Sequence, residues 1–427
     1  MYSLLFGWLY DAAIGIYVFL IRLKALTSLK AAQWLEGRRY LKEQLRNLES
    51  ARPRIWMHCA SAGEFEQGRP LLEALRQRYP QFRYVVTFFS PSGYERYRSD
   101  PLADEVFYLP ADRKSAMREF LNGLEPQLLI LVKYEFWYRM LQELNRKQIP
   151  VMVVAAYFTK NHYLFHPLFR PVRDVLRQSA RLMVQDESSL RLLQQRGFEQ
   201  VVVCGDSRAD RVLQIASADG DLPLAESFVG SARVVVAGST WPRDERLLFN
   251  AFARLPDVWK LIIVPHELSH NHLHRLVRMA GREACLYSQA DGNGPHRILI
   301  VDRMGLLARL YRYATVTYVG GGFDAGIHNV LEAAVYGKPV IFGPRYHRFG
   351  EAKELLEQGV ACSVRDADSL HHAINRMAAD EQLRAASANR TLVVRRSGAA
   401  ACMLNHLEPL LKTAAGGFTG TSAESAS

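Results

Sequence analysis

The fold of this chain is decided by the stretch Val319-Gly320-Gly321-Gly322-Phe323-Asp324-Ala325-Gly326-Ile327-His328-Asn329-Val330-Leu331-Glu332. An apolar strand ends in a glycine-rich turn, and a helical pattern follows from about Gly326. Glycine lets a backbone approach a ligand closely, and a helix N-terminus attracts an anion. Asn329 and Glu332 fall on one helix face, which suits the hydroxyls of a ribose whose phosphate lies at the helix end. The alternative is an ordinary strand–turn–helix whose glycines serve packing.

Short apolar runs alternate with amphipathic stretches in two series along the chain. The first series of expected strands is Ile55–Cys59, Tyr84–Phe89, Leu128–Val132, Val151–Ala155, Leu182–Val184 and Val201–Cys204. The second is Val234–Ala237, Leu261–Val264, Ile298–Val301, Thr315–Val319 and Val340–Phe342. Val-, Ile- and Leu-rich runs separated by helices indicate parallel sheets covered on both faces. We therefore predict two Rossmann-like, doubly wound α/β domains facing a cleft, with ligands at the carboxyl ends of the strands.

Length and local composition divide the chain into four regions. At 427 residues the chain is too long for one comfortable core. Asp, Gly, Ser and Pro concentrate between the two series of strands, around residues 205–230. We predict an apolar N-terminal helix in 1–30, a first domain in 31–205, a second in 206–412, and a disordered Gly- and Ser-rich tail in 413–427.

Charge and cysteine content bound the kind of protein. The net charge of +11 suits nucleic acid, an anionic membrane surface, or a phosphorylated or carboxylated substrate. No nucleic-acid-binding motif accompanies that charge. The cysteines are Cys59, Cys204, Cys285, Cys362 and Cys402. They lie far apart without zinc spacing and several end apolar runs, so we expect small buried side chains in a reducing compartment.

Residues 1–21 are apolar and aromatic apart from a few polar residues and one charge, Asp11, and a basic flank follows. The segment lacks the basic start and the cleavage site of a signal peptide. Asp11 makes a spanning helix costly, by roughly 2.5–3.5 kcal/mol. We predict membrane association, either by a span with the rest of the protein in the cytoplasm or by an aromatic-anchored interfacial helix. The alternative is a first helix packed on the body of the protein.

Polar and glycine residues follow several of the expected strands in both halves. In the first half these are Ala60-Ser61-Ala62-Gly63-Glu64 and Lys133-Tyr134-Glu135-Phe136-Trp137. In the second half they are Gly238-Ser239-Thr240-Trp241, Pro265-His266-Glu267 and Asp302-Arg303-Met304-Gly305. Glu64 enters a helix, where a carboxylate either stabilises the helix N-terminus or acts as a general base.

The order of these motifs resembles the Kdo (3-deoxy-D-manno-octulosonic acid) transferases, which build the inner core of lipopolysaccharide on a lipid A precursor. The family segments W-x-H-x-x-S-x-G-E and E-x-E-L/I-W are matched by Trp56–Glu64 and Lys133–Trp137. The segments G-S-T, P-R/H-x-x and D-x-M-G are matched by Gly238–Thr240, Pro265–Glu267 and Asp302–Gly305. The last element, G-G-x-N-x-L-E followed by G-x-P-V-x-x-G-P, reappears as Gly326–Glu332 and Gly337–Pro344.

The sequence departs from the family pattern in four places. Lys133 stands where the family commonly has a first glutamate. The usual G-N-x-K-F-D is Gly205–Asp210, and the usual N-A-R-L-S is Ala155–Thr159. The Gly-Gly pair of the last motif is altered to Gly326-Ile327. These changes bear on the acceptor side more than on donor binding or the base.

The resemblance implies a GT-B glycosyltransferase that uses CMP-Kdo, inverts the anomeric carbon, and needs neither a cofactor nor a metal. Glu64 would be the general base. The implied donor-binding residues are Ser239, Thr240, Pro265, His266, Met304, Gly305, Gly326, Asn329 and Glu332. Arg208 is the candidate partner of a sugar carboxylate, unless it is an ordinary surface arginine, and Lys133 and Glu135 are further candidates. The implied partners are CMP-Kdo, a lipid A precursor of the lipid IVA type and the cytoplasmic face of the inner membrane, with no nucleic acid.

Two other classes of function stay open. A nucleotide-sugar epimerase shares the two-domain architecture and a cleft carboxylate, but it needs no apolar first segment. A membrane-bound nucleotide-binding module without catalysis explains the anchor and the glycine turns, but it leaves Glu64 without a role.

Overall fold

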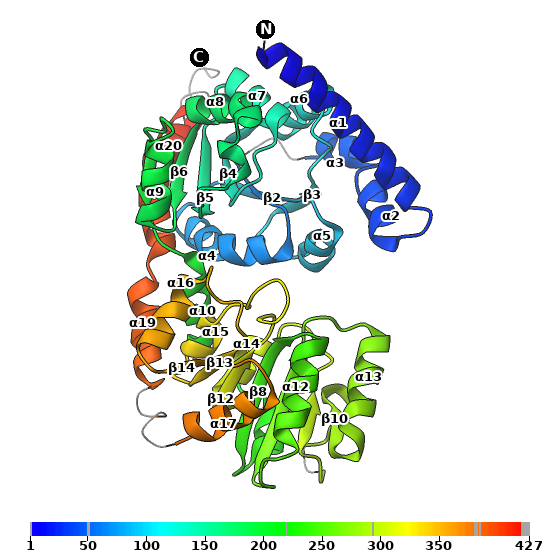
Figure 1. The fold of residues 1–427 in the computed structure, drawn as a ribbon. Helices are drawn as coiled ribbons and strands as arrows, with labels where there is room; N and C mark the ends of the chain where they lie inside the picture. Colours follow the sequence, from blue (N-terminus) through cyan, green and yellow to red (C-terminus); the bar gives the residue numbers. More distant parts are fainter. Residues whose placement is uncertain are drawn as a thin grey trace. The chain divides into compact units, whose positions relative to one another are not determined.

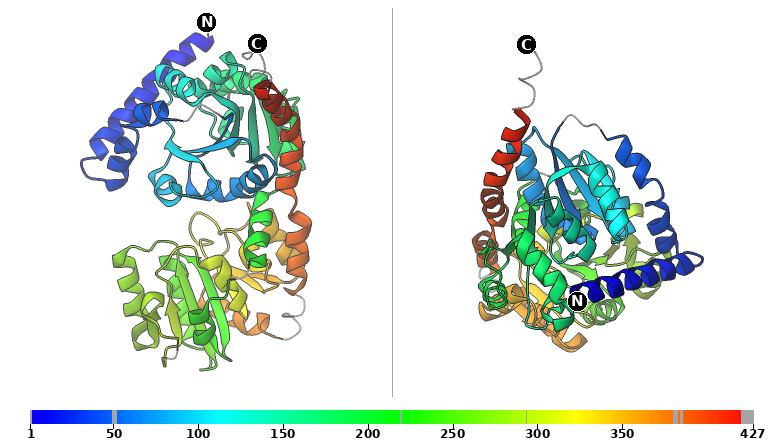
Figure 2. Two further views of the ribbon diagram at one scale, coloured as in Figure 1. Left: turned by 180° about the vertical axis from the view of Figure 1, so that it is seen from behind. Right: turned by 90° about the horizontal axis from the view of Figure 1, so that it is seen from above.

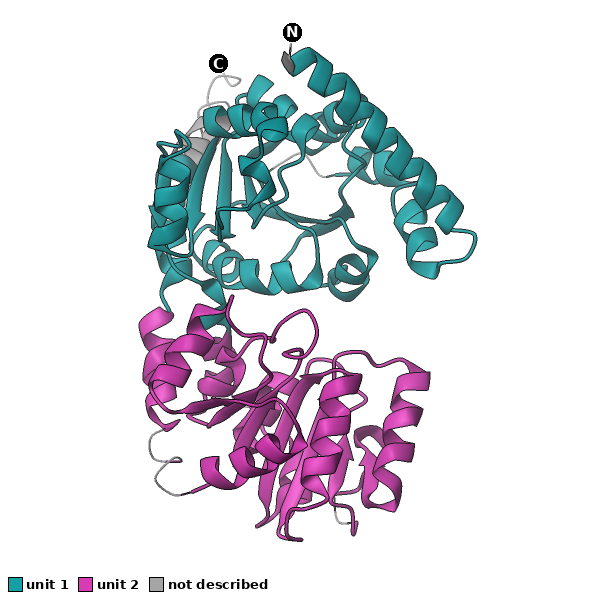
Figure 3. Ribbon diagram, in the orientation of Figure 1, with its two compact units in different colours: residues 1–211, 397–427 teal, residues 212–396 magenta. Residues whose placement is uncertain are grey.

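Two α/β units make up the chain in a computed structural model (Figure 1). It describes residues 2–48, 52–218, 220–292, 294–379, 383 and 386–419. Unit 1 consists of residues 1–211 and 397–427, and unit 2 of residues 212–396 (Figure 3). The described residues of each unit form a seven-stranded parallel sheet, so the predicted pair of doubly wound α/β domains is confirmed.

The sheet of unit 1 has the strand order β3-β2-β1-β4-β5-β6-β7. Its strands are β1 Arg54–Cys59, β2 Arg83–Phe88, β3 Glu105–Tyr108, β4 Pro126–Val132, β5 Val151–Ala156, β6 Ala180–Val184 and β7 Val201–Val203. The order reverses between β1 and β4, which are nevertheless paired in parallel. Such a reversal opens a crevice at the carboxyl ends of the two strands, because their connections leave toward opposite faces.

Helices cover both faces of this sheet (Figure 2). The helices of unit 1 include α1 Tyr2–Lys24, α2 Leu29–Glu36, α3 Leu41–Arg46, α4 Ala62–Arg78, α5 Pro91–Tyr97, α6 Lys114–Leu124, α7 Tyr138–Arg146, α8 Arg170–Ser179 and α9 Glu187–Gln194. Helix α10, Ser207–Ser217, crosses from unit 1 into unit 2. Side chains alternate between the two faces along each strand. Met57 of β1 joins the core beneath α4, whereas Trp56 joins the core beneath α6 to α8.

The sheet of unit 2 has the order β10-β11-β9-β8-β12-β13-β14 and reverses between β8 and β12. Its strands are β8 Arg233–Thr240, β9 Trp259–Pro265, β10 Ala284–Leu286, β11 Ile298–Ile300, β12 Val316–Val319, β13 Val340–Phe342 and β14 Ala361–Ser363. Its helices are α11 Pro223–Val229, α12 Pro242–Phe252, α13 His270–Ala280, α14 Leu307–Leu310, α15 Leu331–Ala334, α16 Gly350–Glu357, α17 Ala367–Met377 and α19 Ala388–Arg396.

The C-terminal helix α20, Ala399–Thr419, belongs to unit 1. The expected second domain of 206–412 is therefore wrong after Arg396. The physical reason is burial: Ala399, Met403, Leu407 and Leu411 lie in the core between α20, α4 and the sheet of unit 1. The helix also runs through the start of the expected disordered tail, 413–427. Residues 420–427 of that tail lie outside the described residues.

Two of the five cysteines are joined. Cys204, directly after β7, forms a disulfide with Cys402 on α20, with the two Cα atoms 5.4 Å apart. The expectation of five reduced cysteines is wrong for this pair, because the return of α20 to unit 1 was not foreseen from the sequence. Cys59, Cys285 and Cys362 are free thiols.

Helix α1 packs on unit 1 with one face only. Phe6, Ile14 and Val18 are buried, and the Tyr10 hydroxyl donates to the buried Asp112 carboxylate at 2.6 Å. Asp11 forms an ion pair with Arg139 on α7, with Oδ2 and Nη2 2.6 Å apart. The charge that made a span costly therefore has a partner on the protein.

The opposite face of α1 is exposed and apolar. Large side chains more than half exposed there are Leu4, Leu5, Trp8, Leu9, Ile16, Phe19 and Leu20. Within the described residues, Ser3–Lys24 is the one helical stretch long and apolar enough to cross a membrane, and 17% of its apolar window is buried. A helix that leaves most of an apolar window exposed presents the kind of surface that contacts lipid or another apolar partner.

Candidate functional site

Two turns of unit 1 follow the strands at which the strand order reverses, β1 and β4. After β1 the chain passes through Ala60 and Ser61 into α4, whose first turn carries Glu64. After β4 it passes through residues 133–137 into α7. Lys133 begins this turn with φ +68°, a left-handed conformation that turns the chain sharply at the end of the strand. The two candidate carboxylates, Glu64 and Glu135, therefore belong to adjacent strand ends.

Glu64 is a half-buried carboxylate at the start of a helix. Its Oε2 accepts a hydrogen bond from the Ala60 N–H at 2.5 Å. Burial raises the pKa of Glu64, although that hydrogen bond and the charge of Lys133 lower it in part. A carboxylate with a raised pKa is a stronger base than an ordinary surface glutamate. Hydrogen bonds from the backbone of Ala60 and Ser61 tie this carboxylate to the turn that begins α4, as expected for a carboxylate that stabilises a helix N-terminus.

Lys133 and Glu135 complete the charge cluster around Glu64. Burial raises the pKa of Glu135 to about 7, with a further rise from the negative charge of Glu64. The indole Nε1 of Trp137 donates to Glu135 Oε2 at 2.9 Å. Burial lowers the pKa of Lys133, and the charge of Glu64 opposes this shift. The predicted residues Glu64, Lys133 and Glu135 therefore form one electrostatically coupled group.

His58 lies beneath this group and was not among the predicted site residues. It is fully buried on β1, and its Nδ1 contacts the Thr87 carbonyl oxygen at 3.1 Å. Nδ1 also lies 2.8 Å from the Thr87 hydroxyl oxygen, so Thr87 holds this edge of the ring. Nε2 lies 4.0 Å from Glu135 Oε2. Burial lowers the pKa of His58 to about 3, so the ring is neutral. Its place in the W-x-H segment was the signal in the sequence.

Arg208 belongs to the same crevice but has a partner. It begins α10, and its Nη2 lies 2.6 Å from Asp206 Oδ2. Both charges act on the pKa of Lys133, Arg208 lowering it and Asp206 raising it. The structure thus gathers four predicted residues in unit 1: Glu64, Lys133, Glu135 and Arg208.

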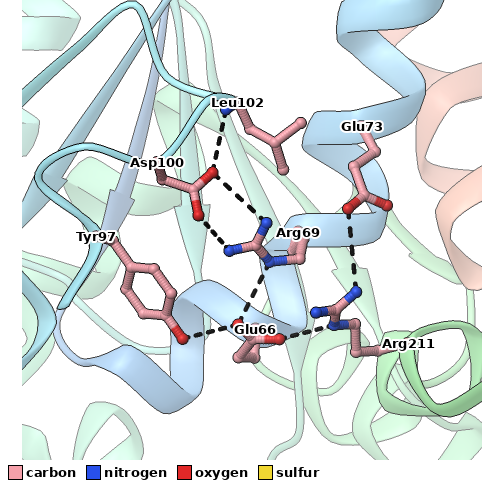
Figure 4. A network of polar contacts seen from close by, with 7 residues as sticks. All are labelled: Glu66, Arg69, Glu73, Tyr97, Asp100, Leu102 and Arg211. Carbon is pink, nitrogen blue, oxygen red and sulfur yellow. Dashed lines mark hydrogen bonds and ion pairs between the residues drawn. The ribbon is translucent and has the colours of Figure 1, made fainter. Parts of the chain in front are cut away.

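A network of ion pairs fixes the helix that carries Glu64 (Figure 4). Glu66 on α4 accepts from the Tyr97 hydroxyl and from Arg211 Nε, each at 2.7 Å. Arg69, one turn further along, pairs with Asp100 at 2.5 Å. The network ties the first two turns of α4 to α5 and α10. Glu64 is therefore held on a helix with little freedom to shift, as a positioned base requires.

Unit 2 presents a second crevice between β8 and β12. Asp244, in the first turn of α12, accepts hydrogen bonds from the backbone N–H groups of Trp241 and Gly321, both at 2.9 Å. It also accepts from the Tyr318 hydroxyl at 2.7 Å. One buried carboxylate therefore locks together the turn after β8 and the glycine turn after β12.

Two glycines of the turn after β12 serve packing. A Cβ on Gly320 would lie 2.3 Å from the Ser239 carbonyl oxygen, and a Cβ on Gly322 would lie 2.6 Å from Gly343 Cα. Three strand ends, those of β8, β12 and β13, meet there backbone to backbone. The packing interpretation of these two glycines is therefore correct.

The helix expected from about Gly326 begins later and is short. Gly326 has φ +133°, and its N–H donates to the Gly321 carbonyl. These features fold the segment back on the glycine turn, and α15 starts only at Leu331 and spans four residues. Asn329 precedes it, with Nδ2 donating to Glu332 Oε1 at 3.3 Å. The Asn–Glu pair lies together as predicted, but the expected helix end beside Gly326 is absent from these described residues.

A cavity of about 530 Å³ opens at this crevice of unit 2. Its lining residues are Trp241, Pro242, Arg243, Arg246, Gly321, Asp324, Ala325, Gly326 and His328. Arg243 and Arg246 line it from one turn of α12, and the carboxylate of Asp324 lines it from the glycine turn. Sequence reasoning missed both arginines, although they follow the Gly-Ser-Thr turn at helical spacing. Of the predicted donor residues, Gly326 is in this lining.

The other predicted donor residues lie around or away from the cavity. The His266 ring stacks on the rings of Trp241 and His328, with centroids 4.7 and 4.6 Å away. Trp241 Nε1 donates to His328 Nε2, and burial together with His266 lowers the pKa of His328 to about 4. Thr240 is buried against Glu245. Outside the lining lie Ser239, Thr240, Pro265, His266, Met304, Gly305, Asn329 and Glu332.

Comparison with known proteins gives a consistent result. The family model described as "3-Deoxy-D-manno-octulosonic-acid transferase (kdotransferase)" matches residues 34–211. A 3-deoxy-D-manno-octulosonic acid transferase of Chlamydia muridarum is 30% identical over 354 residues, which cover 79% of this chain and 81% of the relative. A bifunctional glycosyltransferase/methyltransferase of Fusobacterium nucleatum is 29% identical over 347 residues. The match covers 77% of this chain but only 54% of that longer relative.

Solved structures agree on the fold. A putative UDP-N-acetylglucosamine 2-epimerase from Listeria monocytogenes superimposes with a TM-score of 0.60. The match covers 85% of this chain and 98% of that one at 14% identity. At this identity the likeness concerns the two-unit fold alone.

The raised pKa of Glu135 predicts how the stability of unit 1 depends on pH. A carboxyl group whose folded pKa exceeds its ordinary value contributes stability below that ordinary value and loses it as pH rises through the folded pKa, here about 7. Between about pH 5 and pH 8, the free energy of unfolding of the wild type should fall by roughly 2–3 kcal/mol more than that of Glu135→Gln. Urea titrations across this range measure the difference. In the control Glu187→Gln, which changes an exposed carboxylate, the free energy of unfolding should depend on pH as in the wild type. If Glu135→Gln also showed the pH dependence of the wild type, the burial of the Glu135 carboxyl group would be contradicted.

Proposed function

The chain belongs to the 3-deoxy-D-manno-octulosonic acid transferase family, and from that premise we propose that it is an inverting, metal-independent glycosyltransferase. It moves Kdo from CMP-Kdo to a lipid A precursor of the lipid IVA type, a step in building the inner core of lipopolysaccharide. In this reaction an acceptor hydroxyl oxygen bonds to the anomeric carbon, the bond from that carbon to the CMP phosphate breaks, and the hydroxyl proton passes to a base.

Glu64 is the base in this proposal, and its environment is the observation that carries it. The carboxylate stands at the crevice of a Rossmann-like sheet, at the mouth of α4, with a pKa raised by burial. The turn that holds it and the network around α4 keep it in place before substrate arrives. Glu135 is the second carboxylate of the site. Because its pKa is about 7, it can donate a proton in a hydrogen bond to an acceptor oxygen.

Lys133 is the stronger candidate for the sugar carboxylate. Arg208 already has an ion pair with Asp206, and breaking that pair would leave the Asp206 carboxylate without its partner. Lys133 is a half-buried side chain whose charge interacts with that of Glu64. A substrate carboxylate next to Lys133 would come within reach of the base while compensating the buried positive charge.

The cavity of unit 2 suits the CMP end of the donor. Arg243 and Arg246 can bind the phosphate, whose charge grows as CMP departs, and fixed cations there do the work of a metal ion. The stacked rings of Trp241, His266 and His328 offer an aromatic surface for the cytosine ring of CMP. Asn329 and Glu332 would bind the ribose, as their pairing suggests. Ser239, Thr240, Pro265, Met304 and Gly305 remain candidates for the donor site in its loaded form.

The exposed face of α1 suits an interfacial position on the cytoplasmic side of the inner membrane. The packed face of α1 is already in contact with the protein and carries the Asp11–Arg139 ion pair. A spanning helix would lose these contacts, so the structure favours an interfacial helix. A lipid A precursor keeps its acyl chains in the bilayer, so an enzyme lying at that surface meets both this lipid and a water-soluble donor. The net charge of +11 adds attraction to anionic lipid headgroups.

The fold by itself does not separate a transferase from an epimerase, since both occur on two such units. The activities differ in their products. Incubation with CMP-Kdo should release CMP only when the lipid acceptor is present. An epimerase would convert a nucleotide sugar without acceptor, and a non-catalytic module would bind CMP-Kdo and release nothing.

The first prediction of the proposal concerns the base. Glu64→Gln keeps the size and one acceptor oxygen of the side chain but cannot take a proton, so turnover should fall by roughly 10²–10⁴-fold. Calorimetry should show CMP-Kdo binding unchanged. Both rates are measured with EDTA present, because the proposal requires no metal ion. Glu187→Gln, which changes an exposed carboxylate of unit 1, should retain activity, and wild-type turnover in Glu64→Gln would move the assignment to Glu135.

The second prediction concerns the donor. Arg243→Ala and Arg246→Ala should each weaken CMP-Kdo binding by roughly tenfold or more, since a hydrogen bond to a charged group contributes about 1.5–3 kcal/mol. The two variants should keep the melting temperature of the wild type. Arg254→Ala, which removes an arginine paired with Asp368 on the surface, serves as the control. Unchanged binding in both cavity variants would place the phosphate elsewhere.

The third prediction concerns the membrane. The triple variant Leu5→Ser, Trp8→Ser and Leu9→Ser changes the exposed face of α1 and leaves its packed face intact. Its partition onto vesicles containing lipid A precursor should drop by about tenfold or more, because burying even one such side chain is worth about 1.5–3 kcal/mol.

The matched control for α1 replaces three exposed apolar residues of unit 2, Val258, Met279 and Val394, by serine. It should sediment with vesicles as the wild type does. CMP-Kdo binding should be the same in all three proteins. If the α1 variant sediments like the wild type, another surface makes the membrane contact.

A further inference from the structure

The place where the chain returns to unit 1 holds three metal-ligating side chains that the proposed reaction does not use. Cys204 follows β7, and Cys402 and His406 lie on α20. Cys402 and His406 are one helical turn apart, so both project toward the same side of α20. The Sγ atoms of the two cysteines and a ring nitrogen of His406 all lie within 4.8 Å of one another. In the part of the chain that the structure describes, this is the one such group of three.

We propose that, when the disulfide is reduced, Cys204, Cys402 and His406 bind one Zn²⁺ ion. Zinc prefers thiolate and imidazole ligands at about 2.3 and 2.0–2.1 Å, so three ligand atoms that already lie this close need only side-chain rotations to surround one ion. Two thiolates cancel the charge of Zn²⁺, and the imidazole adds none. The three ligands come from two segments nearly 200 residues apart in sequence, 198 between the cysteines.

The surroundings provide access for the ion. His406 is exposed and lines a cavity of about 240 Å³ at the edge of the sheet formed by β6 and β7. The other lining residues are Arg181, Leu182, Met183, Glu199, Gln200, Val201 and Val202. A water molecule from this cavity can occupy the fourth position of a tetrahedral site. Cys204 is nearly buried, with 9% of its surface exposed, which shields its zinc bond from competing solvent.

The zinc site and the disulfide would make the same connection by different chemistry. Reduction of the disulfide takes two electrons and two protons from an external dithiol, which becomes a disulfide itself. Zinc binding then releases the two thiol protons. In either form α20 stays attached to β7, next to the core residues Met403 and Leu407 that α20 contributes. In a reducing compartment the disulfide would be lost, but bound zinc would still connect α20 to the end of β7.

Zinc content of the full chain tests the proposal directly. The protein is reduced with a phosphine, equilibrated with Zn²⁺, desalted and measured by native mass spectrometry. Reduced wild type should retain one zinc ion more than oxidised wild type. The oxidised chain is a matched control because His270 and His274, whose Nε2 atoms lie 2.8 Å apart, are present in both forms. Zinc held by that surface pair therefore cancels in the comparison.

Variants identify the ligands. Reduced Cys402→Ser should lose the additional ion, and His406→Ala should bind it roughly tenfold more weakly or worse, since even groups behind a ligand contribute 10–100-fold. Cys362→Ser and His372→Ala should behave as wild type. With Co²⁺ in place of zinc, a thiolate-to-metal charge-transfer band should appear in the reduced wild type only. Equal zinc in reduced and oxidised wild type, or full retention by Cys402→Ser, would overturn the proposal.

Discussion

Reversal of strand order is the constraint on which both candidate sites depend. In unit 1, β1 and β4 are hydrogen-bonded neighbours, yet α4 and α7, which follow them, pack on opposite faces of the sheet. The two connections must diverge, so the residues just after each strand are left beside a crevice that backbone does not fill. The same reversal between β8 and β12 leaves a crevice in unit 2. The charged residues of both candidate sites lie at these two places, where the connections after the strands diverge.

The two candidate sites differ in their charged residues. Unit 1 gathers Glu64 and Glu135 around a single lysine, and burial holds the pKa of both carboxyl groups above the ordinary range. Unit 2 uses its buried carboxylate, Asp244, to hold backbone N–H groups together, and it turns Arg243 and Arg246 to the cavity. The two coupled carboxyl groups and the pair of cavity arginines therefore belong to separate sheets.

The sequence predicted the interior of each sheet better than its edges and turns. Long Val-, Ile- and Leu-rich runs identified the central strands, because strands buried on both faces leave that signature. The strands not foreseen, β3, β10 and β14, are all edge strands of three or four residues, which need less apolar sequence. Glu64, Lys133 and Glu135 were candidates from the sequence because they come soon after two strong strands. Arg243 and Arg246 were not, because no local pattern tells which side of a helix start faces a cavity.

Two further errors share a cause in long-range structure. Gly326 fits the start of a helix by sequence, but hydrogen bonds back to the glycine turn hold it in a conformation that delays the helix. Helix α20 follows unit 2 in sequence, yet its apolar face completes the core of unit 1. Asp210 strengthens this return by accepting hydrogen bonds from the N–H groups of Gly398 and Ala400. Since α20 supplies core residues that are made last, unit 1 cannot complete its packing until the whole of unit 2 has been synthesised.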